Sequence, residues 1–257
     1  MPDFKKCYFC AANQYKSAMI KRHVPNAITC CNLLSGCFSI LFLLSGMPVK
    51  AALMVFVAAI FDFFDGFAAR LLKAHSPIGA DLDSLSDVVS FGVAPGFIMY
   101  FLIGLPLERP VLPLFGIDLL PCVAFLLPVF SALRLARFNV DSTQKTSFLG
   151  LPAPAMAVFM ASLPLAFRQL GLLWEGVLNL NAGIAIVLIF SFMMVCNRRF
   201  ISFKMKSVRW KDNETRWIIL GVGVVGFAVF QLVALPFILM FYVLMSLFFP
   251  PKVEQAE

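Results

Sequence analysis

Aspartates are concentrated in one short part of this chain, between residues 62 and 87. The cluster lies at the end of one long apolar run and the start of the next. A carboxylate at the centre of a membrane helix costs about 2.5 to 3.5 kcal/mol, so acids in such segments usually face inward and pair with a base or bind a metal. The pattern therefore predicts a polar site that binds an ion. Its acidic residues are Asp62, Asp65, Asp81, Asp83 and Asp87.

The first part of the cluster fits one face of a helix. Asp62, Asp65, Gly66 and Ala69 have the spacing i, i+3, i+4 and i+7, which aligns side chains along a helix. Gly66 and Ala69 are small enough for a flat base or a ribose to lie against the helix. Arg70 follows directly, and its guanidinium is suited to a phosphate. This face is therefore expected to accept a ligand that carries a base or a ribose together with a phosphate.

The second part of the cluster predicts another helix that turns back on the first. Gly79, Asp83 and Asp87 are four residues apart, so they also share a face. The sequence Ser-Pro-Ile-Gly at 76–79 supplies a turn and a first helical turn that tolerates proline. The two acidic faces are then expected to meet across an antiparallel helical hairpin.

Facing carboxylates in a low dielectric repel one another, so some must stay protonated unless cations bind between them. Ligands that are all oxygen suit hard cations such as Mg²⁺ or Mn²⁺. Two such ions, about 3.5 to 4 Å apart, can act on both sides of a phosphoryl displacement. The sequence therefore predicts a site with two divalent cations.

The elements that hold this site are predicted to be membrane helices. Apolar residues make up 61% of the 257 residues and charged residues only 14%, which is typical of an integral membrane protein. Because lipid offers no partner to irregular backbone, the expected fold class is all-α, a polytopic helical bundle. Spans are expected near 26–48, 50–72, 86–106, 113–137, 152–171 and 177–197, followed by a helical hairpin in 217–249 with a break near Gln231 and Pro236.

Lysines and arginines predict the orientation of these helices. With about eight helices and both termini in the cytoplasm, only Lys50, Arg109 and Arg168 of the 21 basic residues fall outside, and seven helices would change this little. The net charge of +7 then reflects membrane orientation and not a nucleic-acid partner. The site is expected at the cytoplasmic face of the cell (inner) membrane. The expected divisions are a cytoplasmic segment 1–25, a six-helix domain 26–197 that holds the site, a basic loop 198–216, a transmembrane hairpin 217–250 and a cytoplasmic tail 251–257.

The whole pattern from Asp62 reads D-x2-D-G-x2-A-R-x8-G-x3-D-x3-D, with every fixed letter occupied. It resembles the signature of the CDP-alcohol phosphotransferases, membrane enzymes that move a substituted phosphate from a CDP-linked donor to an alcohol. The likeness begins near Pro25, at PNAITCCN, and continues through the sixth span. It implies that Asp62, Asp65, Asp83 and Asp87 are metal ligands, that Asp87 also accepts the proton, and that Asp62, Gly66, Ala69, Arg70, Asn32 and Gly79 contact the CDP portion.

Three polar residues share one face of the first predicted helix: Asn26, Thr29 and Asn32. Side chains of this kind either contact a bound nucleotide or form hydrogen bonds between helices. The sequence leaves both roles open.

Two further segments, RLARFN at 134–139 and FLGLPAPAMA at 148–157, resemble the members of the family that use serine as the acceptor. That likeness implies transfer of the phosphatidyl group from CDP-diacylglycerol to the hydroxyl of L-serine, with release of CMP, by a homodimer. Serine must be held by its charged groups, and Arg134, Arg137 and Asn139 are the candidates. Arg137 is favoured because a guanidinium matches a carboxylate, although the orientation rule alone also accounts for both arginines.

Two other functions remain open. Another member of the family would use glycerol 3-phosphate or inositol phosphate, and Arg134, Arg137 and Lys145 would then bind the acceptor's phosphate. A divalent-cation transporter would also place aspartates in membrane helices. The acids stop at one rim of the bundle, however, and no internal repeat is evident, which counts against transport.

Overall fold

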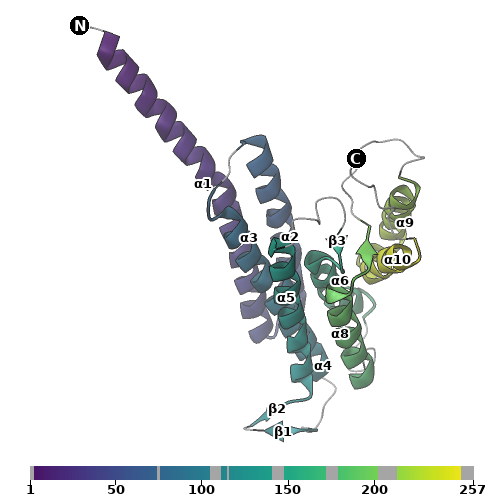
Figure 1. The fold of residues 1–257 in the computed structure, drawn as a ribbon. Helices are drawn as coiled ribbons and strands as arrows, with labels where there is room; N and C mark the ends of the chain where they lie inside the picture. Colours follow the sequence, from purple (N-terminus) through teal and green to yellow (C-terminus); the bar gives the residue numbers. More distant parts are fainter. Residues whose placement is uncertain are drawn as a thin grey trace.

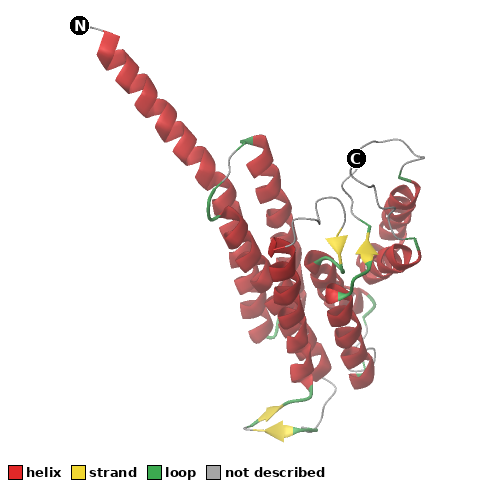
Figure 2. Ribbon diagram, in the orientation of Figure 1, coloured by secondary structure: helices red, strands yellow, loops and turns green. Residues whose placement is uncertain are grey.

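The computed structural model describes residues 3–73, 76–104, 111–114, 116–140, 148–171, 179–201 and 213–249, with the backbone alone for residues 3–22 and 148. Helices dominate these residues, and the strands are two-residue pairs at the ends of the bundle (Figure 2). Five segments are long and apolar enough to cross a membrane: 23–44, 48–71, 79–104, 121–140 and 214–248. The all-α membrane bundle is confirmed, whereas the number of eight spans and the position of the termini stay predictions.

The first two helices form an antiparallel pair that is joined by a tight turn. Helix α1 covers Asp3–Leu44 and α2 covers Pro48–Leu71. Gly46 has a φ of +71° in the turn, a conformation that glycine adopts without steric cost. The first span, expected to start near residue 26, begins at His23, and the helix that contains it starts earlier and runs straight through Pro25. The proline removes one backbone donor, and the rest of the helix continues around it.

The third membrane segment begins earlier than expected. Helix α3 covers Gly79–Asp87, a π-helical turn η1 covers Val88–Val93, and α4 covers Ala94–Gly104. The predicted start at residue 86 followed the apolar run. The acidic stretch before it is also helical, because it packs along α1 with Ser86 and Asp87 buried.

For the fourth span, 113–137, the predicted start is instead too early. Strand β1 (Pro113–Leu114) pairs antiparallel with β2 (Ile117–Asp118) around Gly116, whose φ is +80°. Asp118 accepts the backbone N–H groups of Val111, Leu112 and Leu120, which keeps its pKa below the ordinary value; the bond from Val111 has the largest effect. A short 3-10 helix η2 (Pro121–Phe125) then leads into α5 (Leu126–Val140).

The next two helices lie close to their expected ranges. Helix α6 covers Ala153–Gln169 and α8 covers Leu180–Val195. Strand β3 (Phe148–Leu149), before α6, pairs with β4 (Arg199–Phe200), after α8. Gly150 follows β3 with a φ of +78°, and a Cβ there would lie 2.1 Å from the carbonyl oxygen of Met194. Only glycine fits this close approach of two backbones.

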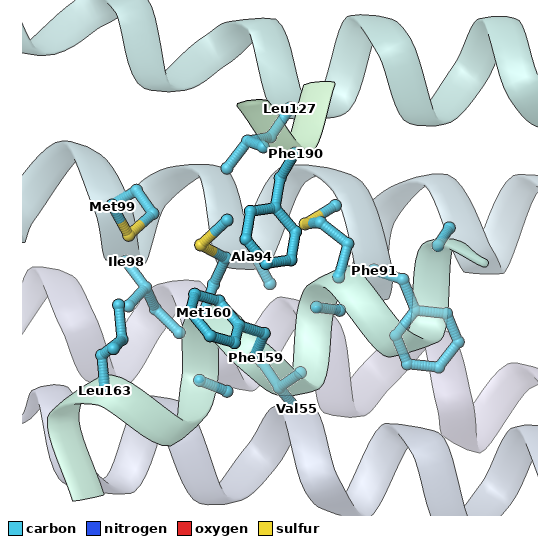
Figure 3. Close-up of a cluster of buried hydrophobic side chains, with 14 of the residues drawn as sticks. Val55, Phe91, Ala94, Ile98, Met99, Leu127, Phe159, Met160, Leu163 and Phe190 are labelled. Carbon is cyan, nitrogen blue, oxygen red and sulfur yellow. The ribbon is translucent and has the colours of Figure 1, made fainter. Parts of the chain in front are cut away.

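The core of the bundle lies where α2, α4, α5, α6 and α8 meet (Figure 3). Phe159 of α6 stacks on Phe190 of α8, with ring centroids 4.4 Å apart. Ile98 of α4 and Val55 of α2 are fully buried beside them. This packing fixes α2 and the third segment relative to each other, and therefore fixes the acidic side chains that they carry.

The last two described helices pack on each other, and the second of them also packs on α6. Helix α9 covers Glu214–Phe230, a 3-10 turn η4 covers Gln231–Val233, and α10 covers Ala234–Phe248 (Figure 1). The break expected near Gln231 is present, and that residue has a φ of +52°. Most of the basic loop 198–216 and the whole tail 251–257 lie outside the described residues, so the domain divisions stay predictions.

Candidate active site

Helices α2 and α3 bring three of the predicted aspartates together. Asp62 comes from α2, while Asp83 and Asp87 come from α3, and one carboxylate oxygen from each lies within 4.8 Å of the others. Asp87 is buried, and the other two are half-buried. Asp81 is on the same helix but exposed, outside this group. The three acids can hold one cation between them.

Asp65, the fourth predicted ligand, is buried on α2 and turned toward α1. Its Oδ2 accepts a hydrogen bond of 2.8 Å from the hydroxyl of Thr29, which also lies 3.0 Å from the carbonyl oxygen of Pro25. Its charge still acts on Asp62, Asp83 and Asp87. Asp65 therefore belongs to the same site, but a residue of α1 fixes its orientation.

Asp87 is also held from α1. The amide Nδ2 of Asn32 donates a hydrogen bond of 3.2 Å to Asp87 Oδ1, and Asn32 is fully buried. Asn26 donates in turn to the hydroxyl of Ser76 at 3.1 Å, before α3. Of the two roles that the sequence left open for these residues, the structure contains the hydrogen bonds between helices. Contact of Asn32 with a nucleotide stays a prediction.

A row of small residues lets α1 approach the acidic helix closely. The hydroxyls of Ser86 and Ser90 donate to the carbonyls of Thr29 and Asn32, at 3.3 and 2.9 Å. A Cβ on Gly36 would lie 2.6 Å from Ser90 Oγ. The sequence analysis did not identify Gly36, Ser86 or Ser90. The signal was present, since small residues four apart are typical of close contacts between membrane helices.

The oxygen atoms of this site fit a hard divalent cation. Among the described residues, the side-chain hydrogen-bond partners of the four carboxylates are the neutral Thr29 and Asn32, and the backbone N–H of Gly66 also bonds to Asp65. Two oxygens, Asp83 Oδ1 and Asn32 Oδ1, are buried without a hydrogen-bond partner in this part of the chain. Buried acceptors without donors are costly, and an oxygen-preferring cation would satisfy them. The donor set is therefore one that can hold a divalent metal ion.

The side of α2 that carries the small residues of the motif is open. Gly66 is exposed, and a Cβ there would meet no described atom within 4 Å. Ala69 is half-buried and Arg70 exposed, so both remain available to a ligand. Gly79 begins α3, where a Cβ would lie 3.5 Å from Asn26 Oδ1. The structure thus leaves space for a ligand beside the carboxylates.

The three residues of α5 that were predicted to bind serine lie in different environments. Arg134 is buried, its Nε has no hydrogen-bond partner among the described residues, and its charge interacts with that of Asp87. Arg137 is exposed and donates to Asn197 Oδ1 at 2.8 Å and to the carbonyl of Val195 at 3.5 Å. Asn139 donates to Ser84 Oγ on α3 at 2.9 Å. Arg134 is the one whose charge acts on the acidic site.

Comparison with known proteins agrees with this chemistry. The family model described as CDP-alcohol phosphatidyltransferase matches residues 22–196. The chain is similar to proteins named CDP-diacylglycerol–serine O-phosphatidyltransferase from two bacteria and an archaeon. For Helicobacter pylori strain J99 the identity is 36% over 188 residues, covering 72% of this chain and 74% of the relative. For Bacillus subtilis strain 168 it is 32% over 194 residues, covering 73% and 98%. For Methanocaldococcus jannaschii it is 34% over 137 residues, covering 53% and 58%.

The matched residues include both acidic helices and the α1 residues that hold them. The family is one of transferases, and this decides between an enzyme and the cation transporter that the aspartates alone left open. The chain belongs to the CDP-alcohol phosphatidyltransferase family and is a membrane enzyme of phospholipid synthesis.

Proposed function

We propose that this enzyme transfers the phosphatidyl group of CDP-diacylglycerol to the hydroxyl of L-serine, giving phosphatidylserine and CMP. The observation that carries the proposal is the convergence of Asp62, Asp83 and Asp87 within 4.8 Å, beside an open face of α2. The choice of serine is supported by the names of the relatives, which are serine O-phosphatidyltransferases.

Two divalent cations, Mg²⁺ or Mn²⁺, are proposed to bind Asp62, Asp65, Asp83 and Asp87. When bound, they neutralise the carboxylates and stabilise negative charge on the phosphoryl oxygens. Thr29 occupies one oxygen of Asp65, which leaves the other for ligation. The orphaned oxygen of Asp83 supports the same assignment.

The donor is proposed to lie along the open side of α2. Gly66 and Ala69 present no bulky side chain to the base and ribose, and the guanidinium of Arg70 binds phosphate oxygens. Asp62 and Gly79 border the same ligand. Asn32 is proposed to act on it through Asp87, whose carboxylate it orients.

Asp87 is proposed to accept the serine proton. The serine hydroxyl oxygen forms a bond to the phosphorus that carries diacylglycerol, and the bond from this phosphorus to the CMP oxygen breaks. The proton of the hydroxyl passes to Asp87. The amide of Asn32 binds Oδ1, so Oδ2 is the oxygen that faces the acceptor. Burial of Asp87 keeps water away from this transfer.

Arg134 is proposed to bind the serine carboxylate. Its support is its burial, the Nε group without a partner among the residues described, and its electrostatic interaction with Asp87. Arg137, which the sequence favoured, would first have to release Asn197. Arg137 and Asn139 are proposed to shape the rim of the acceptor site. The site is proposed to face the cytoplasm from the inner membrane, in a homodimer.

Incorporation of labelled serine tests the acceptor directly. Purified protein with CDP-diacylglycerol and Mg²⁺ or Mn²⁺ should form labelled phosphatidylserine and release one CMP for each. Glycerol 3-phosphate or inositol phosphate in place of serine should give only background, and a chelator should remove activity until the metal is restored. CMP release with one of those phosphates, but not with serine, would assign the enzyme to a different branch of the family.

A further inference from the structure

The C-terminal hairpin, helices α9 and α10 with the turn η4, lies beyond residue 196, where the match to the family model ends. Few of its side chains are buried, as expected of helices that face lipid. Two polar residues of α10 are exceptions. Tyr242 and Ser246 are 5% and 1% exposed and lie four residues apart, so they share the face that packs on the rest of the protein.

These two side chains bind both polar backbone groups of one residue. The hydroxyl of Tyr242 donates to the carbonyl oxygen of Ile201 at 3.0 Å. The N–H of Ile201 donates to Ser246 Oγ at 3.4 Å. Ile201 is itself buried. Helix α10 therefore provides hydrogen-bond partners for the N–H and the carbonyl of Ile201, which would otherwise be buried without partners.

Ile201 follows β4, and β4 holds the segment that begins α6. Arg199 pairs with Leu149, and the N–H of Gly150 donates to the carbonyl of Arg198 at 2.9 Å. The N–H of Leu151 donates to Met193 at 2.9 Å. The FLGL segment, residues 148–151, is thus fixed between the end of α8 and a strand that α10 anchors. Figure 1 shows β3 and β4 between α6 and the hairpin.

Tyr242 also lies within electrostatic range of the acidic site's arginine. Arg134 interacts with Asp87 of α3 and with Tyr242 of α10. A residue of the hairpin therefore lies near Arg134, the residue that is proposed to bind the carboxylate of the acceptor.

We propose that Tyr242 is a positioning residue of the active site: it anchors the β3–β4 pair through Ile201 and borders Arg134, so the C-terminal hairpin forms part of the acceptor side. The proposal rests on the proposed function for the identity of the acceptor. It does not depend on serine in particular, because the hydrogen bonds of Tyr242 and Ser246 to Ile201 are the same whichever acceptor binds.

Removal of the Tyr242 hydroxyl tests this role. Tyr242→Phe keeps the ring and should raise the KM for the acceptor about fivefold, the expected effect of one lost hydrogen bond. The KM for CDP-diacylglycerol should stay within twofold of the wild-type value, because the donor residues lie on α2. Ser246→Ala should shift the acceptor KM in the same direction, since it frees the N–H of Ile201.

Two matched controls separate positioning from general damage. Tyr100→Phe removes a hydroxyl from a half-buried tyrosine of α4 that stacks on Phe125. Ser191→Ala removes a buried hydroxyl of α8 that has no hydrogen-bond partner among the described residues. Both should leave the two KM values unchanged. Thermal unfolding of all four variants in the same detergent shows whether any has lost its fold.

The outcomes are distinct. An acceptor KM that rises while the donor KM and the unfolding midpoint stay constant supports the proposal. Unchanged kinetics in Tyr242→Phe, or an equal loss with both substrates in parallel with a lower midpoint, overturns it. If the wild-type enzyme uses another alcohol instead of serine, the proposed function fails, and the same comparison with that alcohol still decides the role of Tyr242.

Discussion

The third membrane segment and the C-terminal hairpin are both apolar, but they contribute differently to the enzyme. The most apolar window of residues 79–104 has a mean hydropathy of 1.6 and is 61% buried, whereas the window in 214–248 has 2.5 and is 11% buried. The third segment directs aspartates and serines at α1, while the hairpin directs valines and phenylalanines outward. Hydropathy therefore identifies membrane helices in this chain, and burial identifies the helix that carries the chemistry.

The largest effect is expected at Asp87, in the buried segment. Asp87→Asn keeps the shape and the hydrogen bond to Asn32 but removes the proton acceptor and a metal ligand, so turnover should fall about a thousandfold or more. Binding of CDP-diacylglycerol should remain measurable.

The control is Asp81→Asn, an exposed aspartate of the same helix, which should retain wild-type turnover. Phosphatidylserine formation and donor binding by calorimetry measure both variants. Normal turnover in Asp87→Asn would remove this residue from the mechanism.

An intermediate effect is expected at Thr29, which holds Asp65 from α1. Thr29→Val is nearly isosteric and removes the only side-chain donor to Asp65 among the described residues, leaving the backbone N–H of Gly66. Residues that orient metal ligands typically contribute 10- to 100-fold to metal affinity, so the metal concentration for half-maximal activity should rise at least about tenfold.

Ser35→Ala provides the comparison for Thr29. Ser35 is buried on the same helix, and its hydroxyl donates to the carbonyl oxygen of Cys31 one turn earlier in that helix. A metal titration of activity should separate the two variants. Equal titration curves would mean that Thr29 has no influence on the metal site.

A smaller effect is expected for two glycines, one on α1 that packs against the third membrane segment and one in the hairpin. Gly36→Ala places a Cβ 2.6 Å from Ser90 Oγ and should separate α1 from η1, at a cost of about 1 to 3 kcal/mol in stability. Gly221→Ala in α9 meets no described atom within 4 Å and should be neutral or slightly stabilising. Thermal unfolding in detergent measures both. An unstable Gly221→Ala would show that the outer face of the hairpin is packed against something.

The smallest effect is expected at Asp118, at the end of the bundle away from the acids (Figure 1). Hydrogen bonds from Val111, Leu120 and Leu112 lower its pKa, so its contribution to the β1–β2 pair is complete above the ordinary value of 3.8 and is lost only as the pH falls through the lowered value. Asp118→Ala should make this strand pair more sensitive to protease and leave turnover unchanged at neutral pH. A change in turnover would show that the β1–β2 pair influences the acidic site at the other end of the bundle.

Most of the candidate site could be predicted from residue types and spacing. The spacing of Asp62 and Asp65, and of Asp83 and Asp87, places each pair on one helix face, and the turn at 76–79 brings the faces together. The helix ends were predicted less well, because apolar runs do not mark where a helix begins when its polar residues are buried. The acidic start of α3 is an example, whereas the β1–β2 pair shows that an apolar run need not be helical at all.

The sequence by itself predicted a membrane bundle, because hydropathy is a local property. Its fixed pattern of aspartates predicted a divalent-cation site, and the family resemblance of that pattern implied a CDP-linked donor. Only the tertiary structure decided which neighbours hold those aspartates. Thr29 and Asn32 on α1 are more than thirty residues away from their partners along the chain, and Tyr242 reaches Ile201 from a hairpin beyond the family motif. Hydrogen bonds between distant segments depend on helix packing, and no spacing within one helix encodes them.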